Sequence, residues 1–148
     1  MNPRIKTNQG DLIGVPPSDS DMQHASQQAR DAFASFTDQL RKRDPACSIF
    51  IVKAFYPDPR ISGGGEHLWL TVYSASDQSA TGVITSRPMF ITTVKAGDTV
   101  EVHLPQLSDW LYVCDGSAVG GFTVQLLRSR MTPEQRQQHD SAYPFSFE

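Results

Sequence analysis

The stretch Glu66-His67-Leu68-Trp69-Leu70-Thr71-Val72-Tyr73 decides the fold, because its residues alternate in character with a period of two. This period predicts a β-strand whose successive side chains point to opposite faces of a sheet. One face would carry Leu68, Leu70 and Val72, and the other His67, Trp69, Thr71 and Tyr73. The run CSIFIVKAFY, from Cys47 to Tyr56, is rich in β-branched and aromatic residues and predicts a second strand before it. A sheet is therefore expected at the centre of the protein.

Three further segments have the pattern of strands. They lie around Thr81–Ile84, over Thr99–Leu104 and over Asp109–Val113. The turn sequence Ala96-Gly97-Asp98 precedes the segment that begins at Thr99. A second turn sequence, Asp115-Gly116, follows the segment that ends at Val113. Together with the two strands above, they predict a mainly antiparallel sheet of about five strands.

One amphipathic helix is predicted before the first strand. Ser20 and Gln23 form a capping-box pattern, which indicates that the helix begins at Ser20. Apolar residues then recur at steps of three and four positions: Met22, Ala25, Ala29, Ala32, Phe33, Phe36 and Leu40. Pro45 prevents the helix from continuing. We expect the apolar stripe to cover the sheet.

Short helices are predicted near the end of the chain. The segment FTVQLLRSRM follows Gly120-Gly121 and is compatible with a helix or a strand, and its length and Leu-Leu-Arg sequence favour the helix. Thr132-Pro133-Glu134-Gln135 repeats the capping-box pattern with proline at the first helical position. The aromatic tail Tyr143–Phe147 would dock on the body or on a partner. Residues 1–18 are polar, contain Gly and Pro and show no periodicity, so they are expected to form a flexible arm. The resulting prediction is a single α+β domain over residues 19–148.

The composition excludes several classes of protein. The 148 residues carry a net charge of −3, and the pI is near 5.7, which argues against a nucleic-acid partner. The sequence contains neither the apolar run of a secretory signal nor one long enough to span a membrane. We therefore expect a cytoplasmic protein without a membrane partner. Cys47 and Cys114 are interpreted as small buried hydrophobes, with a disulfide or a thiolate nucleophile as the alternatives.

Four short motifs are similar to those of a bacterial family. They are Glu66-His67-Leu68-Trp69-Leu70, Gly97-Asp98-Thr99-Val100, Asp109-Trp110 followed by Tyr112, and Gly120-Gly121-Phe122-Thr123. In this order and spacing the chain resembles the YegJ-like family, known as domain of unknown function 2314. The resemblance implies a small cytoplasmic bacterial domain without an established activity. It also implies similarity to members that look like antitoxin or immunity proteins encoded beside secreted toxins.

The residues with reactive side chains do not form a recognisable catalytic or metal-binding pattern. Glu66 and His67 are adjacent on a strand, so their side chains point to opposite faces. His67 with His103, Cys114 or Glu101 lacks the spacing of a metal site. Asp109 is either a catalytic carboxylate or an acceptor for backbone N–H groups of its own turn. We expect no catalytic residue, no metal and no cofactor, and the protein is not predicted to be an enzyme.

The acidic excess lies in the predicted sheet. Residues 46–127 contain four basic and seven acidic groups, whereas the two ends are balanced. With the aromatic residues of the strands, this allows an acidic face that would bind a basic protein partner, although acids scattered over a core would give the same count. The candidate contact residues are Glu66, His67, Trp69, Glu101, Asp109, Tyr112 and Asp115.

These observations lead to two main hypotheses about function, while a third class, a hydrolase or transferase, would require a pocket where Asp109, His67 or Glu66 converge. The first is a non-catalytic protein-binding domain, specifically a bacterial immunity protein that neutralises a cognate secreted toxin by occluding its active site. The alternative is a sensor for a small molecule or nucleotide. In the sensor, Gly120, Gly121 and Arg128 would hold an anion, because the N–H groups at a helix N-terminus favour negative charge. A tight turn is the competing interpretation of the two glycines.

Overall fold

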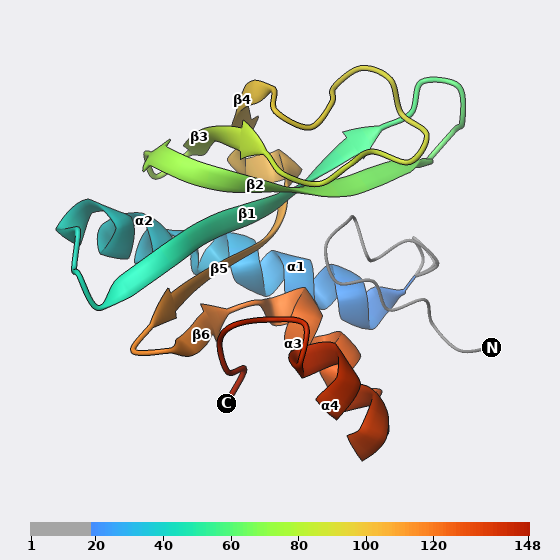
Figure 1. Cartoon of the computed structure of the whole chain (residues 1–148). Helices are drawn as coiled ribbons and strands as arrows, with labels where there is room; N and C mark the ends of the chain where they lie inside the picture. The colour runs from blue at the N-terminus through green and yellow to red at the C-terminus, as the bar shows by residue number, and fades with distance from the viewer. Residues whose placement is uncertain (1–18) are drawn as a thin grey trace.

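Six strands form one antiparallel sheet in residues 19–148, the part of the chain that the computed structural model describes. The strand order is β4-β3-β2-β1-β5-β6, with β1 and β2 near the centre (Figure 1). Their bounds are β1 Cys47–Pro57, β2 Gly65–Ala75, β3 Ser79–Ile84, β4 Thr99–His103, β5 Leu107–Cys114 and β6 Ser117–Gly120. The predicted fold class is confirmed, with one strand more than expected. The predicted arm over residues 1–18 lies outside the described residues.

Helices α1 (Ser20–Asp31) and α2 (Phe33–Lys42) cover one face of the sheet (Figure 1). The sequence predicts one continuous helix that begins at Ser20 with a capping box of Ser20 and Gln23; the start at Ser20 is confirmed, but the capping residue and the continuity are wrong. Asp19 is the N-cap, because its side chain accepts a hydrogen bond from the Met22 backbone N–H. The helix is also interrupted at Ala32, where neither glycine nor proline marks the break. From Ala29 to Phe36 the apolar stripe faces the sheet as predicted, whereas Met22 packs with Leu127 and Met131.

The main core lies between these helices and the sheet. Phe33 and Phe36 are almost fully buried against Val52, Leu68 and Leu70 of β1 and β2. The Phe36 ring also lies 5.7 Å from that of Trp110 on β5, measured between centroids. Because side chains alternate along a strand, the packing of apolar side chains against α1 and α2 places the intervening side chains on the opposite face of the sheet.

The opposite face of the sheet carries Lys53, Trp69 and Asp109, since Lys53 of β1 is paired with Trp69 of β2 and with Asp109 of β5. Helices α3 (Phe122–Ser129) and α4 (Pro133–Asp140) follow β6, and the predicted capping box of α4 is present. The aromatic tail docks on the body, where the Ala118 N–H donates to the Ser146 carbonyl at 2.7 Å. A short 3-10 turn, η1 (Leu104–Gln106), links β4 to β5.

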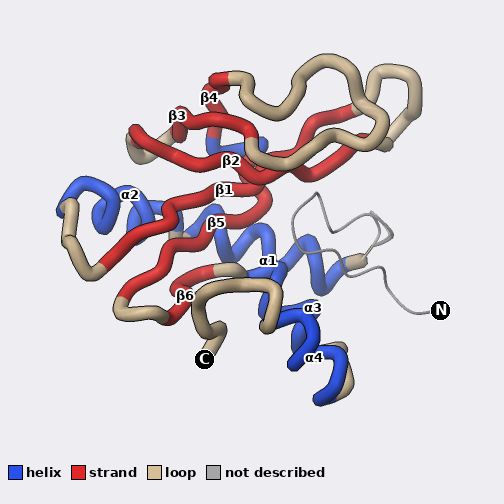
Figure 2. Tube along the Cα trace, viewed as in Figure 1, coloured by secondary structure: helices blue, strands red, loops and turns tan. Residues whose placement is uncertain are grey.

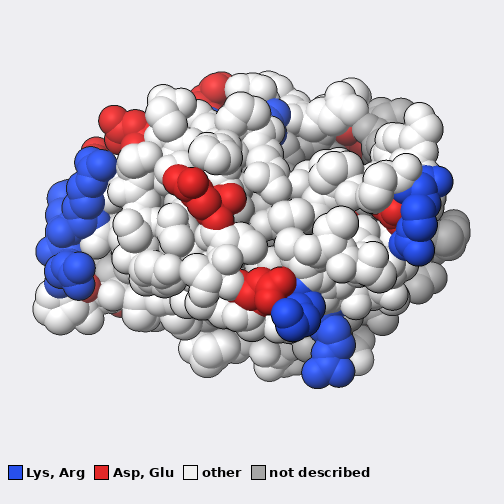
Figure 3. All heavy atoms as spheres, turned by 90° about the horizontal axis from the view of Figure 1, so that it is seen from above, with Lys and Arg blue, Asp and Glu red and all other residues white. Residues whose placement is uncertain are grey.

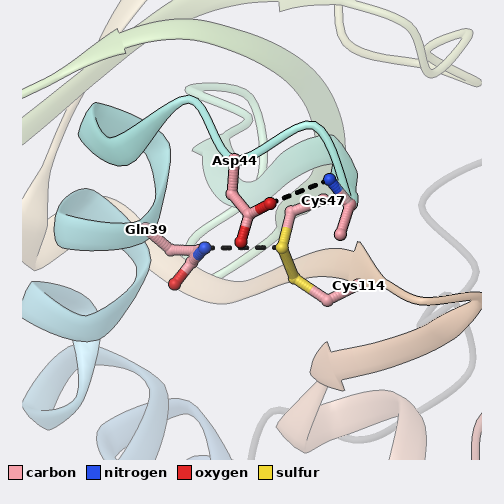
Figure 4. Close-up of a disulfide and its surroundings, with 5 residues drawn as sticks. Gln39, Asp44, Cys47 and Cys114 are labelled. Atoms are coloured by element: carbon pink, nitrogen blue, oxygen red, sulfur yellow. Dashed lines mark hydrogen bonds between the residues drawn. A yellow bond between two sulfur atoms is a disulfide. The ribbon is translucent and has the colours of Figure 1, made fainter.

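Cys47 and Cys114 form a disulfide between β1 and β5 (Figure 4). Their interpretation as free, buried hydrophobes is therefore wrong. The two residues are 67 positions apart in the sequence and lie opposite each other only because β1 pairs with β5 in this register. The side-chain amide of Gln39 donates to the Cys47 sulfur at 3.4 Å, so the end of α2 packs over the bond.

In residues 19–148, none of the helices combines the length and the apolar character needed to cross a membrane.

Candidate functional site

Glu66 fixes the shape of the loop between β3 and β4. Its side chain is buried, and its carboxylate accepts hydrogen bonds from three consecutive backbone N–H groups, those of Met89, Phe90 and Ile91, at 2.8, 2.8 and 2.9 Å. Hydrogen bonds to an ionised acceptor are stronger than neutral ones. The backbone of this loop is therefore bound to the beginning of β2, whereas the side chains of the loop take no part in these hydrogen bonds.

A second buried carboxylate fixes the neighbouring loop, which joins β1 to β2. Asp58 accepts two hydrogen bonds from the Arg60 guanidinium, both at 2.9 Å, and these hold the pKa of the Asp58 carboxyl below its ordinary value. Arg60 also donates to the Phe90 carbonyl at 2.7 Å. Since that bond joins the two loops, they lie side by side at one end of the sheet (Figure 2).

The two fixed loops present large apolar side chains to solvent. Ile61 is 53% exposed, Met89 55% and Phe90 39%. We call Ile61, Met89 and Phe90 the loop-end surface. Side chains of this kind, gathered on ordered loops, are typical of protein contact sites. None of the three was among the residues predicted from the sequence, because their exposure depends on which backbone groups Glu66 and Asp58 bind.

A buried polar cluster lies on the sheet face away from α1 and α2. The Lys53 ammonium donates to the Thr123 hydroxyl at 2.6 Å and lies 5.3 Å from the centre of the Trp69 ring. The Thr123 hydroxyl in turn donates to the Asp109 carboxylate. Lys53, Asp109 and Thr123 are all fully buried. Buried charges need such partners, because an unpaired charge in the protein interior is strongly unfavourable.

The Asp109 carboxylate accepts four hydrogen bonds and also interacts with the charge of Lys53. One carboxylate oxygen accepts from the Trp110 and Phe122 backbone N–H groups, and the other accepts from the backbone N–H and hydroxyl of Thr123. Burial raises the pKa of Asp109, while the charge of Lys53 and the hydrogen bonds from Thr123 oppose this rise. Because every contact to the carboxylate is a donor, the bonding is that of an ionised acid.

His67 extends the cluster toward β5. Its ring Nδ1 lies 2.9 Å from the Ser108 hydroxyl, and that hydroxyl donates to the Lys53 carbonyl at 3.2 Å. Burial, together with the nearby charge of Lys53, lowers the pKa of His67 to about 3. The ring is therefore neutral at physiological pH. The polar groups of this cluster bind one another, and these hydrogen bonds indicate that the cluster has a structural role.

The anion-binding residues predicted from the sequence are occupied by internal partners. Asp109 takes the N–H groups at the N-terminus of α3, directly after Gly120 and Gly121. Both glycines have positive φ, 86° and 69°, which fits the tight-turn interpretation. Arg128 is buried and bound to Asp140 at 2.7 Å. These donors are therefore engaged by side chains of the protein itself.

The predicted protein-contact residues do not form one acidic face. Glu66 and Asp109 are buried and bind backbone groups, and Tyr112 packs under α2 against Phe36 and Phe50. Glu101 and Asp115 are exposed on separate elements, β4 and the turn after β5. In the view from above, acidic side chains lie in small separate groups, some beside Lys or Arg and others among uncharged residues (Figure 3). His67 and Trp69 belong to the buried cluster described above.

Among residues 19–148, no group of three or more His, Cys, Asp or Glu side chains could hold a metal ion.

Comparison with known proteins identifies the family. The family model described as "Uncharacterized protein conserved in bacteria (DUF2314)" matches residues 19–147. The chain belongs to the DUF2314 family. The resemblance inferred from the four sequence motifs is therefore confirmed. In this DUF2314 chain, two of those motifs supply the buried acceptors Glu66 and Asp109, and a third supplies the turn at Gly120 and Gly121.

Two curated proteins are similar to this DUF2314 chain. A Neisseria meningitidis serogroup B protein that carries the name of an ankyrin repeat protein is 33% identical over 138 residues, covering 90% of this chain and 54% of its own length. YegJ of Escherichia coli K12 is 32% identical over 106 residues, covering 72% of this chain and 66% of its own length. The chain thus spans between about half and two thirds of these relatives. No solved structure matches it.

Proposed function

We propose that this protein is a non-catalytic protein-binding domain whose loop-end surface contacts the partner. The observation that carries the proposal is the exposure of Ile61, Met89 and Phe90 on loops that buried carboxylates hold in place. Rigid loops bind with a smaller entropic cost than mobile ones, since fewer side chains and backbone groups must be ordered on association. A large apolar side chain on such a loop can occupy a recess in a partner and supply much of the binding energy.

The charges near the loop-end surface specify the partner further. Arg87 is exposed on the loop between β3 and β4, whereas Arg60 is paired with Asp58 and Lys95 with Asp98, so these two loops carry a net positive charge. A complementary partner therefore has an apolar recess bordered by carboxylates. This differs from the basic partner expected from the acidic excess of the sequence, because Asp58, Glu66 and Asp109 account for part of that excess and are buried.

A bacterial immunity protein is the more specific form of this proposal. It is supported by the family resemblance and by paired loops at one end of the sheet, a shape that suits insertion into the active site of a toxin. The test is co-expression with the product of the neighbouring gene, with pull-down and cell growth as the two measurements. Failure to bind that product and to rescue growth would reject the immunity function.

Variants test whether the loop-end surface is the contact. We expect the double variant Met89→Ala/Phe90→Ala to bind the captured partner at least about tenfold more weakly. Tyr73→Ala is the control, because Tyr73 is a large aromatic side chain that is 58% exposed but lies on β2. Equal affinity of the double variant and the control would assign the contact to another surface.

The disulfide bears on where the protein works. Disulfides persist in oxidising compartments and are reduced in the cytosol. For this reason we propose an oxidising compartment in place of the cytoplasm expected from the sequence. The test is trapping of free thiols in intact cells with acid and a maleimide reagent. Labelling of both Cys47 and Cys114 would contradict the proposal.

A further inference from the structure

An apolar pocket of about 200 Å³ lies between the sheet and the C-terminal tail, on the face away from α1 and α2. The residues that line it come from β1, β2, β5, α3, the tail and the residue after β3: Ile51, Trp69, Thr85, Leu111, Val124, Tyr143, Phe145 and Phe147. The loop-end surface contributes none of these residues. The pocket is thus separate from the proposed protein contact.

The floor of the pocket is rigid. Ile51, Trp69 and Leu111 are side chains of three adjacent strands, and Lys53 lies under the Trp69 ring at 5.3 Å from its centre. The Trp69 backbone N–H also donates to the buried Ser86 hydroxyl at 2.9 Å. A floor held in this way does not need to rearrange when a ligand binds.

The outer wall of the pocket consists of the aromatic tail. Phe147 is buried, and its carbonyl accepts from the Gln125 amide at 2.9 Å. Its ring also packs against the guanidinium of Arg128, 5.2 Å away. The hydrogen bond between Ala118 and Ser146 holds the tail beside β6. The tail is therefore an ordered part of the site.

From this geometry we infer that the pocket binds a small neutral aromatic molecule of one or two rings. Two features specify the ligand. An engineered cavity of about 150 Å³ lined by Leu, Ile and Phe binds benzene, so about 200 Å³ suffices for one ring and accepts a second. The lining side chains are aromatic or aliphatic, with hydroxyls only on Thr85 and Tyr143, and none is charged. A charged ligand would lose its hydration without gaining a partner.

The two tryptophans provide the test within a single molecule. The Trp69 ring lines the pocket, whereas the Trp110 indole N–H donates to the Ala29 carbonyl on the opposite face of the sheet. In nitrogen-15 NMR spectra we expect indole and toluene to shift the Trp69 side-chain signal saturably and to leave that of Trp110 unchanged. Phenylacetate, which has a similar ring and a negative charge, should bind at least about tenfold more weakly.

The decisive test compares indole binding by a variant whose pocket is filled with binding by a variant whose pocket is left open. Thr85 is exposed and lines the pocket, and its backbone N–H donates to the Trp69 carbonyl at 2.9 Å, a hydrogen bond that remains when the side-chain hydroxyl is removed. Thr85→Phe should therefore place a ring in the pocket without disturbing the core, and we expect it to weaken indole binding at least about tenfold. Thr92→Phe is the matched control, because Thr92 is exposed in the same loop and does not line the pocket. The inference is overturned if the wild-type Trp69 signal does not shift up to the solubility limit of indole. It is also overturned if Thr85→Phe binds as tightly as Thr92→Phe.

Discussion

Loss of the disulfide is expected to destabilise this protein substantially. Cys47 and Cys114 are 67 residues apart, and closing a loop of this size lowers the entropy of the unfolded chain by an amount equivalent to about 4 kcal/mol. Measured disulfides generally contribute about 2 to 4 kcal/mol. For a chain of this size, a loss of about 3 kcal/mol lowers the melting temperature by roughly 6 to 12 °C.

The assay is thermal unfolding followed by circular dichroism, with and without a phosphine reductant. Mass spectrometry of alkylated protein establishes that the bond is reduced. The double variant Cys47→Ala/Cys114→Ala should melt at the temperature of the reduced wild type, and the reductant should not change the melting of that variant. An unchanged melting temperature in fully reduced wild type would refute the reasoning, since it would mean that the bond does not constrain the unfolded chain.

Three other predictions follow from the buried polar groups. Asp109→Asn removes the charge near the buried Lys53 ammonium and should cost roughly 3 to 5 kcal/mol in urea unfolding, while Asp115→Asn, at an exposed turn, should change little. Glu66→Gln leaves one acceptor oxygen for three N–H donors, so amides of residues 89–91 should exchange with deuterium faster, and unchanged exchange would exclude Glu66 as the anchor. His67 has a pKa of about 3 in the fold against 6.5 as its ordinary value, so the unfolded chain binds more protons between these values. Its contribution to stability should therefore be full above about pH 6.5 and decline as the pH falls toward 3, and His67→Gln should make the urea midpoint less dependent on pH over that interval.

Local patterns were sufficient to predict most of the secondary structure. The alternation from Glu66 to Tyr73 gave the correct strand and the correct two faces, because only a period of two keeps apolar side chains on one side of a strand. The capping box at Thr132 located α4 for a similar reason, since its two hydrogen bonds involve residues three positions apart. The short β6 was missed because SAVG has no alternation of its own.

The candidate sites depend on contacts between residues far apart in the sequence. Asp109 was considered as an acceptor for backbone N–H groups of its own turn, but its carboxylate also accepts from backbone N–H groups 13 and 14 positions away. Glu66 was selected as a partner contact, whereas its carboxylate accepts from a backbone N–H group 24 positions away. The exposure of Met89 and Phe90 follows from those bonds, and no sequence pattern reports it.

The sequence by itself determined the α+β class, the strand faces and the family, because these depend on periodicity and on motifs that are read along the chain. Only the tertiary structure decided that Cys47 is bonded to Cys114, that Lys53 is buried beside Asp109, and that the tail closes a pocket over Trp69. The physical reason is that each of these features requires strand register and helix packing to bring distant residues within a few ångströms.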